Sequence, residues 1–212
     1  MTIDAAHNTS AENSGVVPEE RARAEAYALI GNLFYEAPSS ELLRAIATSQ
    51  TPCNDGSDSG FCQAWRALQH AAASAEAGTL KEEFESAFIS TGRPAVMLFG
   101  SFYLAGFLNE KPLAQLRDEL AKMGLARRGD CHDSEDHISA LCDVMRLLIV
   151  GDDGTAPAAL DVQRDFFVRY IKSWNIRFCD AVNSADETCF YKHVAQFARE
   201  FFDLEYESFA IA

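Results

Sequence analysis

The sequence predicts an all-α protein, built as a single-domain helical bundle of about eight to ten helices. Alanine occurs 33 times and leucine 18 times, whereas valine, isoleucine and threonine together occur 26 times. This balance favours helices over strands. Apolar residues recur at helical spacing along much of the chain, and no alternating apolar run lies between turn residues.

The composition excludes several classes of protein. The formal net charge of -14 argues against binding to nucleic acid or to an anionic membrane, since both require clustered lysine and arginine. No run of 18 apolar residues is present, so we expect no stable membrane insertion. The acidic N-terminus lacks the features of a signal peptide. We therefore expect a cytoplasmic protein with reduced cysteines.

The N-terminal part divides into a leader and two helices. We expect residues 1–17 to be a disordered leader and residues 18–208 to form the domain. Pro18, followed by two glutamates, is a favourable helix start. This first helix ends at Pro38, and a serine caps a short second helix. The apolar face of the first helix consists of Tyr27, Ile30, Leu33 and Phe34.

The central part contains short helices separated by loops. After a loop over residues 51–60, we expect a helix from Phe61 to about Ala77, broken at Gly78 and Thr79. Further helices are then predicted up to Ile89, over residues 102–109, and from Pro112 to about Met123. Loops over residues 90–101 and 124–132 connect them.

The C-terminal part contains three long helices. Asp133 is the expected N-cap of the first one, with Asp136 at position N3. Its apolar stripe consists of Ile138, Leu141, Cys142, Met145, Leu148 and Ile149. The stripes of the last two helices consist of Phe167, Ile171, Trp174 and Phe178, and of Phe190, Val194, Phe197, Phe201 and Leu204. Their aromatic content predicts that this pair lies in the centre of the bundle.

The sequence contains no phosphate-binding loop and no nucleophile elbow. Cys131, His132, Asp133 and His137 lie close together, but no Glu-x-x-His accompanies them, as a di-iron bundle would require. Two alternatives stay open at this point. One is a small hydrolase that uses Cys131, Asp133 and His137, and the other is a metal-binding helical sensor.

Two other segments are unusual. Residues 133–137 place three carboxylates at a predicted helix start, where they can cap the helix and also receive basic side chains. The loop over residues 90–104 gathers Met97, three aromatic residues and other apolar residues around its glycines. Such a loop either folds into the core or lines a groove for an apolar peptide.

These segments resemble motifs of the TorD/DmsD family, the cytoplasmic chaperones of molybdoenzyme maturation. Residues 133–145 (DSEDHISALCDVM) resemble the acidic-x-E-D-H-x-x-x-x-hydrophobic-x-x-M motif of this family. Residues 84–104 resemble its Phe/Tyr-x-Ser-x-Tyr-Leu segment, and residues 23–35 resemble its first helix. Two final aromatic helices, from Phe166 onward, complete the resemblance. Ser134 stands where the family often has proline, and Leu98-Phe99 where it often has Pro-Tyr.

The resemblance implies a non-enzymatic chaperone without a cofactor or metal, acting as a monomer or homodimer. Its partner would be the catalytic subunit of a molybdoenzyme, or the twin-arginine leader of that subunit, bound until the cofactor is inserted. Residues 100–108 are most similar to members associated with formate dehydrogenase. The implied client-binding residues are Asp133, Glu135, Asp136 and His137 for the arginines, and Phe99, Ser101 and Tyr103 for the apolar part.

Overall fold

The computed structural model describes residues 17–50, 59–89, 92, 94–108, 110–126, 133–152 and 155–211. Within these residues the β pairing is limited to two isolated bridges, so the predicted all-α class is confirmed. The helices are α1 (Pro18–Tyr35), α2 (Ser40–Thr48), α3 (Gly60–Ser74), α4 (Ala77–Phe84), η1 (Glu85–Ile89), α5 (Gly100–Ala105), α6 (Lys111–Lys122), α7 (Ile138–Val150), α8 (Leu160–Phe167), η2 (Val168–Lys172), α9 (Ser173–Ser184) and α10 (Phe190–Ile211). The two η segments are π-helical turns that continue α4 and join α8 to α9.

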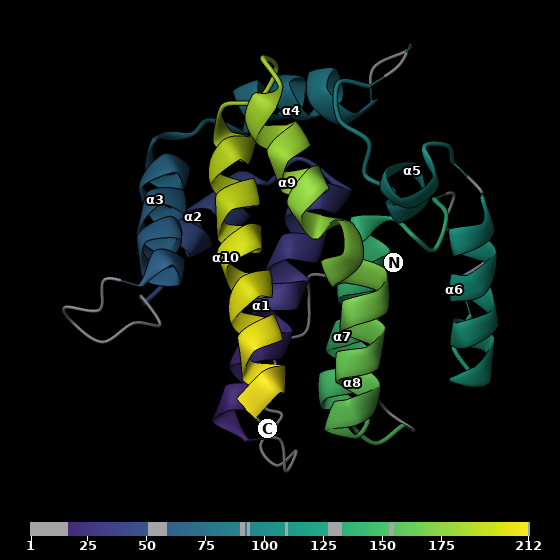
Figure 1. The fold of residues 1–212 in the computed structure, drawn as a ribbon. Helices are drawn as coiled ribbons and strands as arrows, with labels where there is room; N and C mark the ends of the chain where they lie inside the picture. Colours follow the sequence, from purple (N-terminus) through teal and green to yellow (C-terminus); the bar gives the residue numbers. More distant parts are fainter. Residues whose placement is uncertain are drawn as a thin grey trace.

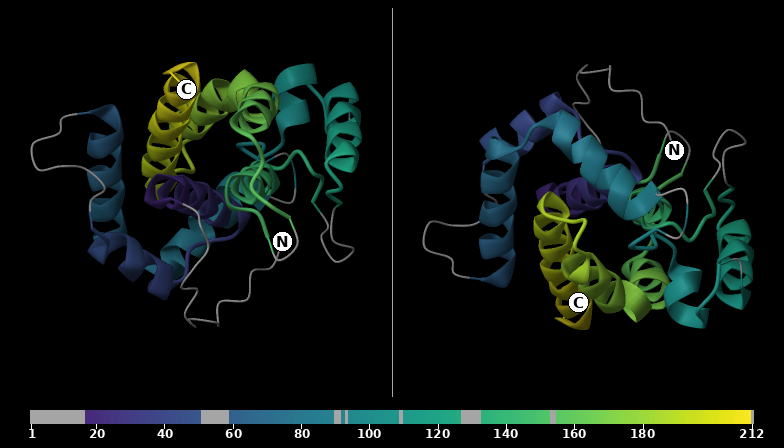
Figure 2. Two further views of the ribbon diagram at one scale, coloured as in Figure 1. Left: turned by 90° about the horizontal axis from the view of Figure 1, so that it is seen from below. Right: turned by 90° about the horizontal axis from the view of Figure 1, so that it is seen from above.

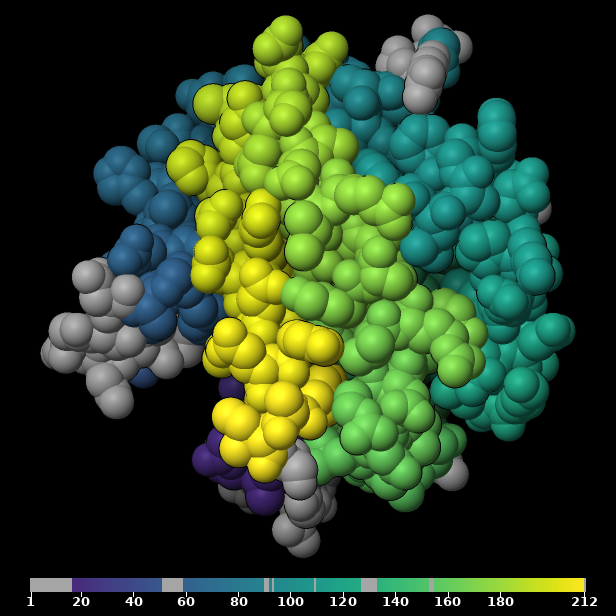
Figure 3. Space-filling model, viewed as in Figure 1, coloured from purple at the N-terminus to yellow at the C-terminus, as the bar shows by residue number. Residues whose placement is uncertain are grey.

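Helices α1, α7, α9 and α10 form the centre of the molecule, and the other helices surround it (Figures 1 and 2). Helices α1 and α7 pack against each other, and α10 packs against both α3 and α9 (Figure 1). Helices α3 and α6 lie on opposite sides of this centre (Figure 2). In the space-filling view, α10 and the α8–η2–α9 rod lie side by side, and α6 forms one edge of the molecule (Figure 3).

The contact between α1 and α7 contains the two apolar stripes that the sequence predicts. All four residues predicted for α1 and all six predicted for α7 are buried. The two helices approach closely at Gly31, where an added Cβ would lie 3.3 Å from Cys142 Cβ and 3.4 Å from the Ser139 carbonyl oxygen. A larger side chain at position 31 would push the two helices apart.

The predicted stripes of the last two helices are buried with one exception. Leu204 is 47% exposed, so its assignment to the core is wrong. The stripe of α10 continues from Phe201 in a step of four residues rather than three, which places Glu205 on the core face. A carboxylate occupies this buried position because α1 supplies its partners.

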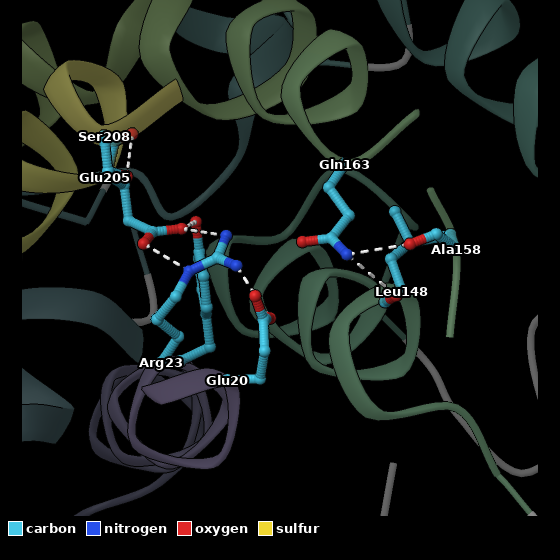
Figure 4. A network of polar contacts seen from close by, with 8 residues as sticks. Glu20, Arg23, Leu148, Ala158, Gln163, Glu205 and Ser208 are labelled. Carbon is cyan, nitrogen blue, oxygen red and sulfur yellow. Dashed lines mark hydrogen bonds and ion pairs between the residues drawn. The ribbon is translucent and has the colours of Figure 1, made fainter. Parts of the chain in front are cut away.

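Glu205 joins the C-terminal half of α10 to the start of α1 (Figure 4). Its carboxylate accepts two hydrogen bonds from Arg23, at 2.7 Å from Nε and 2.9 Å from Nη2. The buried Tyr27 hydroxyl donates a third, at 3.1 Å. Arg23 also donates to Glu20 at 2.8 Å, so the buried charges of this network are paired.

Two predicted helix boundaries are wrong. Ala75 and Glu76 are extended, so α4 begins at Ala77 and includes the residues expected to break it. This start brings Leu80 and Phe84 of α4 into the core. Helix α5 ends at Ala105 rather than Asn109, because Gly106 takes the left-handed conformation (φ +85°) and its N–H caps the Phe102 carbonyl.

The ends of the chain and the cysteines complete the comparison. Helix α1 begins at Pro18 as predicted, whereas the leader up to residue 16 lies outside the described residues. Helix α10 continues past residue 208 to Ile211.

Cys142, Cys179 and Cys189 are free thiols. Cys62 is disulfide-bonded, so the expectation of reduced cysteines is wrong for this residue.

Candidate functional site

The two segments that stand out in the sequence meet in the structure. Phe99 and His137 form an isolated antiparallel bridge. The Gly100 N–H donates to the Asp136 carbonyl at 2.9 Å, and the Ile138 N–H donates to the Leu98 carbonyl at 2.9 Å. The acidic segment therefore lies next to the aromatic loop.

The acidic segment is a turn rather than the first turn of a helix. Helix α7 begins at Ile138, and its N-cap is His137, whose Nδ1 accepts from the Ser139 N–H at 3.1 Å. The assignment of Asp133 as the N-cap, with Asp136 at N3, is wrong. The physical reason is the bridge to the aromatic loop, which holds His137 extended and delays the start of the helix.

Asp136 ties the two segments together through its side chain. Its Oδ2 accepts from the Ser101 N–H at 2.7 Å, and its Oδ1 accepts from the Ser134 hydroxyl at 2.5 Å. The N-cap residue of α5, Phe99, makes no side-chain cap, so Asp136 supplies one from a distant part of the chain. The carboxylate is 4% exposed, and a ligand at the surface has little access to it.

His137 is neutral at physiological pH. Its side chain is buried, with the edge of its ring against Phe99 at a centroid distance of 5.1 Å. Burial lowers its pKa to about 4, and the opposing effect of Asp133 and Asp136 does not restore it. Since Nδ1 accepts a hydrogen bond, the proton of the neutral ring is on Nε2.

Ser101 and Tyr103 lie in α5, which directly follows the bridge residue Phe99. The Tyr103 ring stacks on Trp174 at 5.3 Å, and its hydroxyl donates to the Met97 carbonyl at 2.8 Å. Burial raises the pKa of this hydroxyl, so it remains a donor. Gly100 is required here, because an added Cβ would lie 3.0 Å from the Trp174 indole nitrogen.

One side of the acidic turn lines a largely apolar cavity of about 110 Å³, which we call the acidic cavity. It lies between the end of α1, the end of α6, the turn and one face of α7. Its apolar walls are made by Tyr35, Leu120, Leu125, Ala126, Ala140, Val144 and Leu147, and its polar lining is made by Asp133, Ser134, Glu135, His137, Ser139 and Asp143. Apolar walls beside three carboxylates suit a ligand that is both basic and apolar.

Two of these carboxylates, Glu135 and Asp143, lie close to arginine side chains. Glu135 accepts from Arg117 Nε of α6 at 2.8 Å and is 15% exposed. Partial burial raises the pKa of Asp143, which lies 3.9 Å from Arg146. Sequence reasoning missed Asp143 and the apolar walls. Val144 and Leu147 are apolar although they lie outside the core stripe of α7, and this pair could have indicated a second apolar surface on the helix.

The predicted site residues thus lie in three environments. Asp133, Glu135 and His137 line the acidic cavity. Ser101 and Asp136 line a second cavity of about 60 Å³ between α5, α6 and η2, where the buried Ser101 hydroxyl has no partner among the described residues. Phe99 and Tyr103 line neither cavity. Phe99 packs against His137, and Tyr103 stacks on Trp174.

The residues of the two alternative functions are only partly described. Cys131 and His132 lie outside the described residues. In the part of the chain that is described, no three His, Cys, Asp or Glu side chains are grouped to bind a metal ion. The buried thiol of Cys142, adjacent to the cavity-lining Asp143, has its pKa raised by burial and is protonated. Across the same residues, no helix has the length and apolar character needed to span a membrane.

Comparisons with known proteins agree with the motifs. The model of the family described as nitrate reductase delta subunit matches residues 54–180. Chaperone protein TorD of Aliivibrio fischeri is 27% identical over 133 residues, which cover 59% of this chain and 62% of that protein. TorD of Aliivibrio salmonicida is 28% identical with the same coverage, and TorD of Vibrio cholerae is 25% identical over 128 residues. The match thus spans less than two thirds of these relatives.

The family model covers more than half of the chain, and the curated relatives carry the name chaperone protein TorD. The chain therefore belongs to the nitrate reductase delta subunit family, the TorD/DmsD-type family of chaperones rather than enzymes.

Proposed function

We propose that the chain is a cytoplasmic chaperone for molybdoenzyme maturation. It binds the N-terminal leader, of the twin-arginine type, or the apo form of a molybdopterin oxidoreductase, and it assists cofactor insertion before export or assembly. The observation that carries this proposal is the acidic cavity, where apolar walls and carboxylates share one opening. A twin-arginine leader has the complementary chemistry, since it is basic at one end and apolar along the rest.

Each part of the cavity has a role in this proposal. Glu135 and Asp133 receive arginine side chains through charge-assisted hydrogen bonds. The walls that include Leu120 and Val144 receive apolar side chains of the leader. Asp136 and His137 act as positioning residues, because their burial and their hydrogen bonds support a role in shaping the turn.

Three of the predicted residues do not contact the client in this proposal. Phe99, Ser101 and Tyr103 hold the loop that pairs with the acidic turn, so their effect on the client is indirect. The run Gly-Ser-Phe-Tyr-Leu-Ala-Gly-Phe-Leu over residues 100–108 supports formate dehydrogenase as the client.

The first test is to identify the client. The tagged chain is used to capture proteins from the cytosol of its native cell, and retained proteins are identified by mass spectrometry. We expect a molybdoenzyme catalytic subunit, and a formate dehydrogenase subunit in particular. Failure to retain any molybdoenzyme subunit would contradict the proposal.

The second test locates the binding site. The probe is a labelled peptide with two adjacent arginines followed by about ten apolar residues, roughly three helical turns. Val144→Asp places a charge on the apolar wall, so we expect the Kd to rise about tenfold or more, equivalent to at least ~1.4 kcal/mol. Val162→Asp is the matched control, since Val162 is exposed on α8 and lines neither cavity. Equal binding by both variants would exclude the acidic cavity as the site.

A further inference from the structure

The acidic cavity already holds a guanidinium at its edge. Arg117 of α6 donates from Nε to Glu135 Oε2 at 2.8 Å, across 18 residues of chain. The two partners differ in their exposure. The Glu135 side chain is 15% exposed, whereas that of Arg117 is 51% exposed. The carboxylate is therefore partly desolvated and needs a cation, while the arginine can leave for water at small cost.

The helix that carries Arg117 also forms a wall of the cavity. Leu120, one turn beyond Arg117 on α6, lines the acidic cavity, and Leu125 and Ala126 follow directly after the helix. Arg117 itself is not among the residues that line the acidic cavity, so it acts on the site through Glu135, the carboxylate to which the client's basic end is proposed to bind.

Helix α6 is held mainly by apolar packing, since its Leu113, Leu116 and Leu120 are buried in the core. Its main helix partner is the short α5, and it lies at the edge of the molecule (Figures 1 and 3). Its polar ties to η2 are long, at 3.3 Å from the Tyr170 hydroxyl to the Gln115 carbonyl and 3.9 Å from Arg169 to Glu119. The second cavity and a further surface hollow also lie along α6, which leaves space on its inner side.

We propose that Arg117 is an internal occupant of the subsite in which Glu135 binds a client arginine. This inference rests on the proposed function and adds its regulation. A client arginine takes the place of Arg117, so one ion pair replaces another and Arg117 returns to water. Helix α6 stays packed through its buried leucines, and the apolar part of the leader contacts the walls of the acidic cavity.

The exchange explains how the cavity selects among apolar peptides. A peptide without a correctly placed arginine cannot replace Arg117, so it gains only the contacts with the apolar walls. Arginine exchanges better than lysine, because its planar fork can donate two hydrogen bonds to the carboxylate, whereas the lysine ammonium acts as a point charge.

The test measures affinity for the same double-arginine peptide by fluorescence anisotropy. Arg117→Gln removes the internal competitor, and we expect the Kd to fall about 2- to 5-fold, as for the loss of one exposed ion pair. The matched control is Arg199→Gln, which removes the same charge from an ion pair with Asp180 at 2.9 Å between α10 and α9. Its Kd should stay at the wild-type value or fall less.

Two further variants separate the outcomes. Glu135→Gln should weaken binding, and the double variant Arg117→Gln/Glu135→Gln should bind no better than Glu135→Gln alone, since the competitor has lost its partner. A peptide with two lysines should gain less from Arg117→Gln than the arginine peptide does. Circular dichroism verifies that each variant is folded.

Hydrogen exchange gives an independent measurement. Binding of the peptide should slow the exchange of amides in the acidic turn and leave that of α6 amides unchanged, since Leu113, Leu116 and Leu120 stay buried. The inference is wrong if the peptide binds while Arg117→Gln binds equally or more weakly, or if binding leaves the exchange of the acidic turn unchanged. If no protein binds the peptide, the proposed function itself fails, and this outcome is distinct from the first.

Discussion

Replacement of Asp136 distinguishes a structural residue from a client contact. In Asp136→Ala the Ser101 N–H loses its acceptor inside the protein, and the Ser134 hydroxyl loses a charged partner. A hydrogen bond to a charged group contributes about 1.5–3 kcal/mol, and a buried unsatisfied donor costs about 1–3 kcal/mol. Since Ser134 can bond to water instead, we expect a loss of about 3 kcal/mol in the free energy of unfolding.

The assay combines urea denaturation with thermal melting. For a chain of this size, about 3 kcal/mol corresponds to a fall in Tm of roughly 6–12 °C. Asp136→Asn is the control, because its amide oxygen still accepts from the Ser101 N–H, and we expect it to lose about 1 kcal/mol. The reasoning would be refuted by an Asp136→Ala protein that melts like wild type but no longer binds the client peptide, since Asp136 would then be a direct contact.

Three other perturbations test the fold. Glu205→Ala leaves Arg23 with one partner and should reduce the free energy of unfolding by about 3 kcal/mol, measured by urea denaturation; a loss below about 1 kcal/mol would mean that the pair behaves as an exposed one. Gly151→Ala should destabilise by more than about 1 kcal/mol, seen as a lower Tm, because φ is +72° and the added Cβ collides with the Thr155 carbonyl. Burial lowers the pKa of His137 to about 4, so between about pH 6.5 and pH 4 the unfolded chain binds a proton that the folded protein does not bind. The free energy of unfolding should therefore fall by up to about 3 kcal/mol as the pH decreases from 6.5 to 4. His137→Asn keeps an N-cap side chain and should lose this part of the pH dependence. If the free energy of unfolding depended equally on pH in both proteins, His137 would not be a neutral buried ring.

The helical stripes could be predicted from the sequence because they depend on local periodicity. Ile138 to Ile149 recur at helical spacing, and each stripe residue of α7 is buried as predicted. The start of α7 could not be predicted in this way. The acidic turn is held by hydrogen bonds to residues 98–101, more than 30 positions away. Capping rules consider only neighbouring residues, so they favoured Asp133 over His137.

The candidate site, like the fold, could be predicted from the sequence only in part. The motif indicated residues 133–137 as the site, and Asp133, Ser134, Glu135 and His137 line the acidic cavity. The sequence offered no means of separating Glu135, at the cavity, from Asp136, which is buried behind the turn. It also offered no signal for Tyr35 as part of the wall. That contact depends on how the end of α1 packs against α7, which is a tertiary feature.

The bridge between Leu98–Gly100 and Asp136–Ile138 has a consequence for how this fold can vary. The chain that contains α5 and α6 leaves and returns at the same point, where backbone hydrogen bonds fasten its two ends. Doubling the length of such a closed excursion costs only about 0.6 kcal/mol of chain entropy. The segment can therefore be lengthened, shortened or exchanged as a module while α1 and α7 stay packed. Under the proposed function, such an exchange would alter the wall that Leu120 contributes to the acidic cavity, and with it the leader that the cavity accepts.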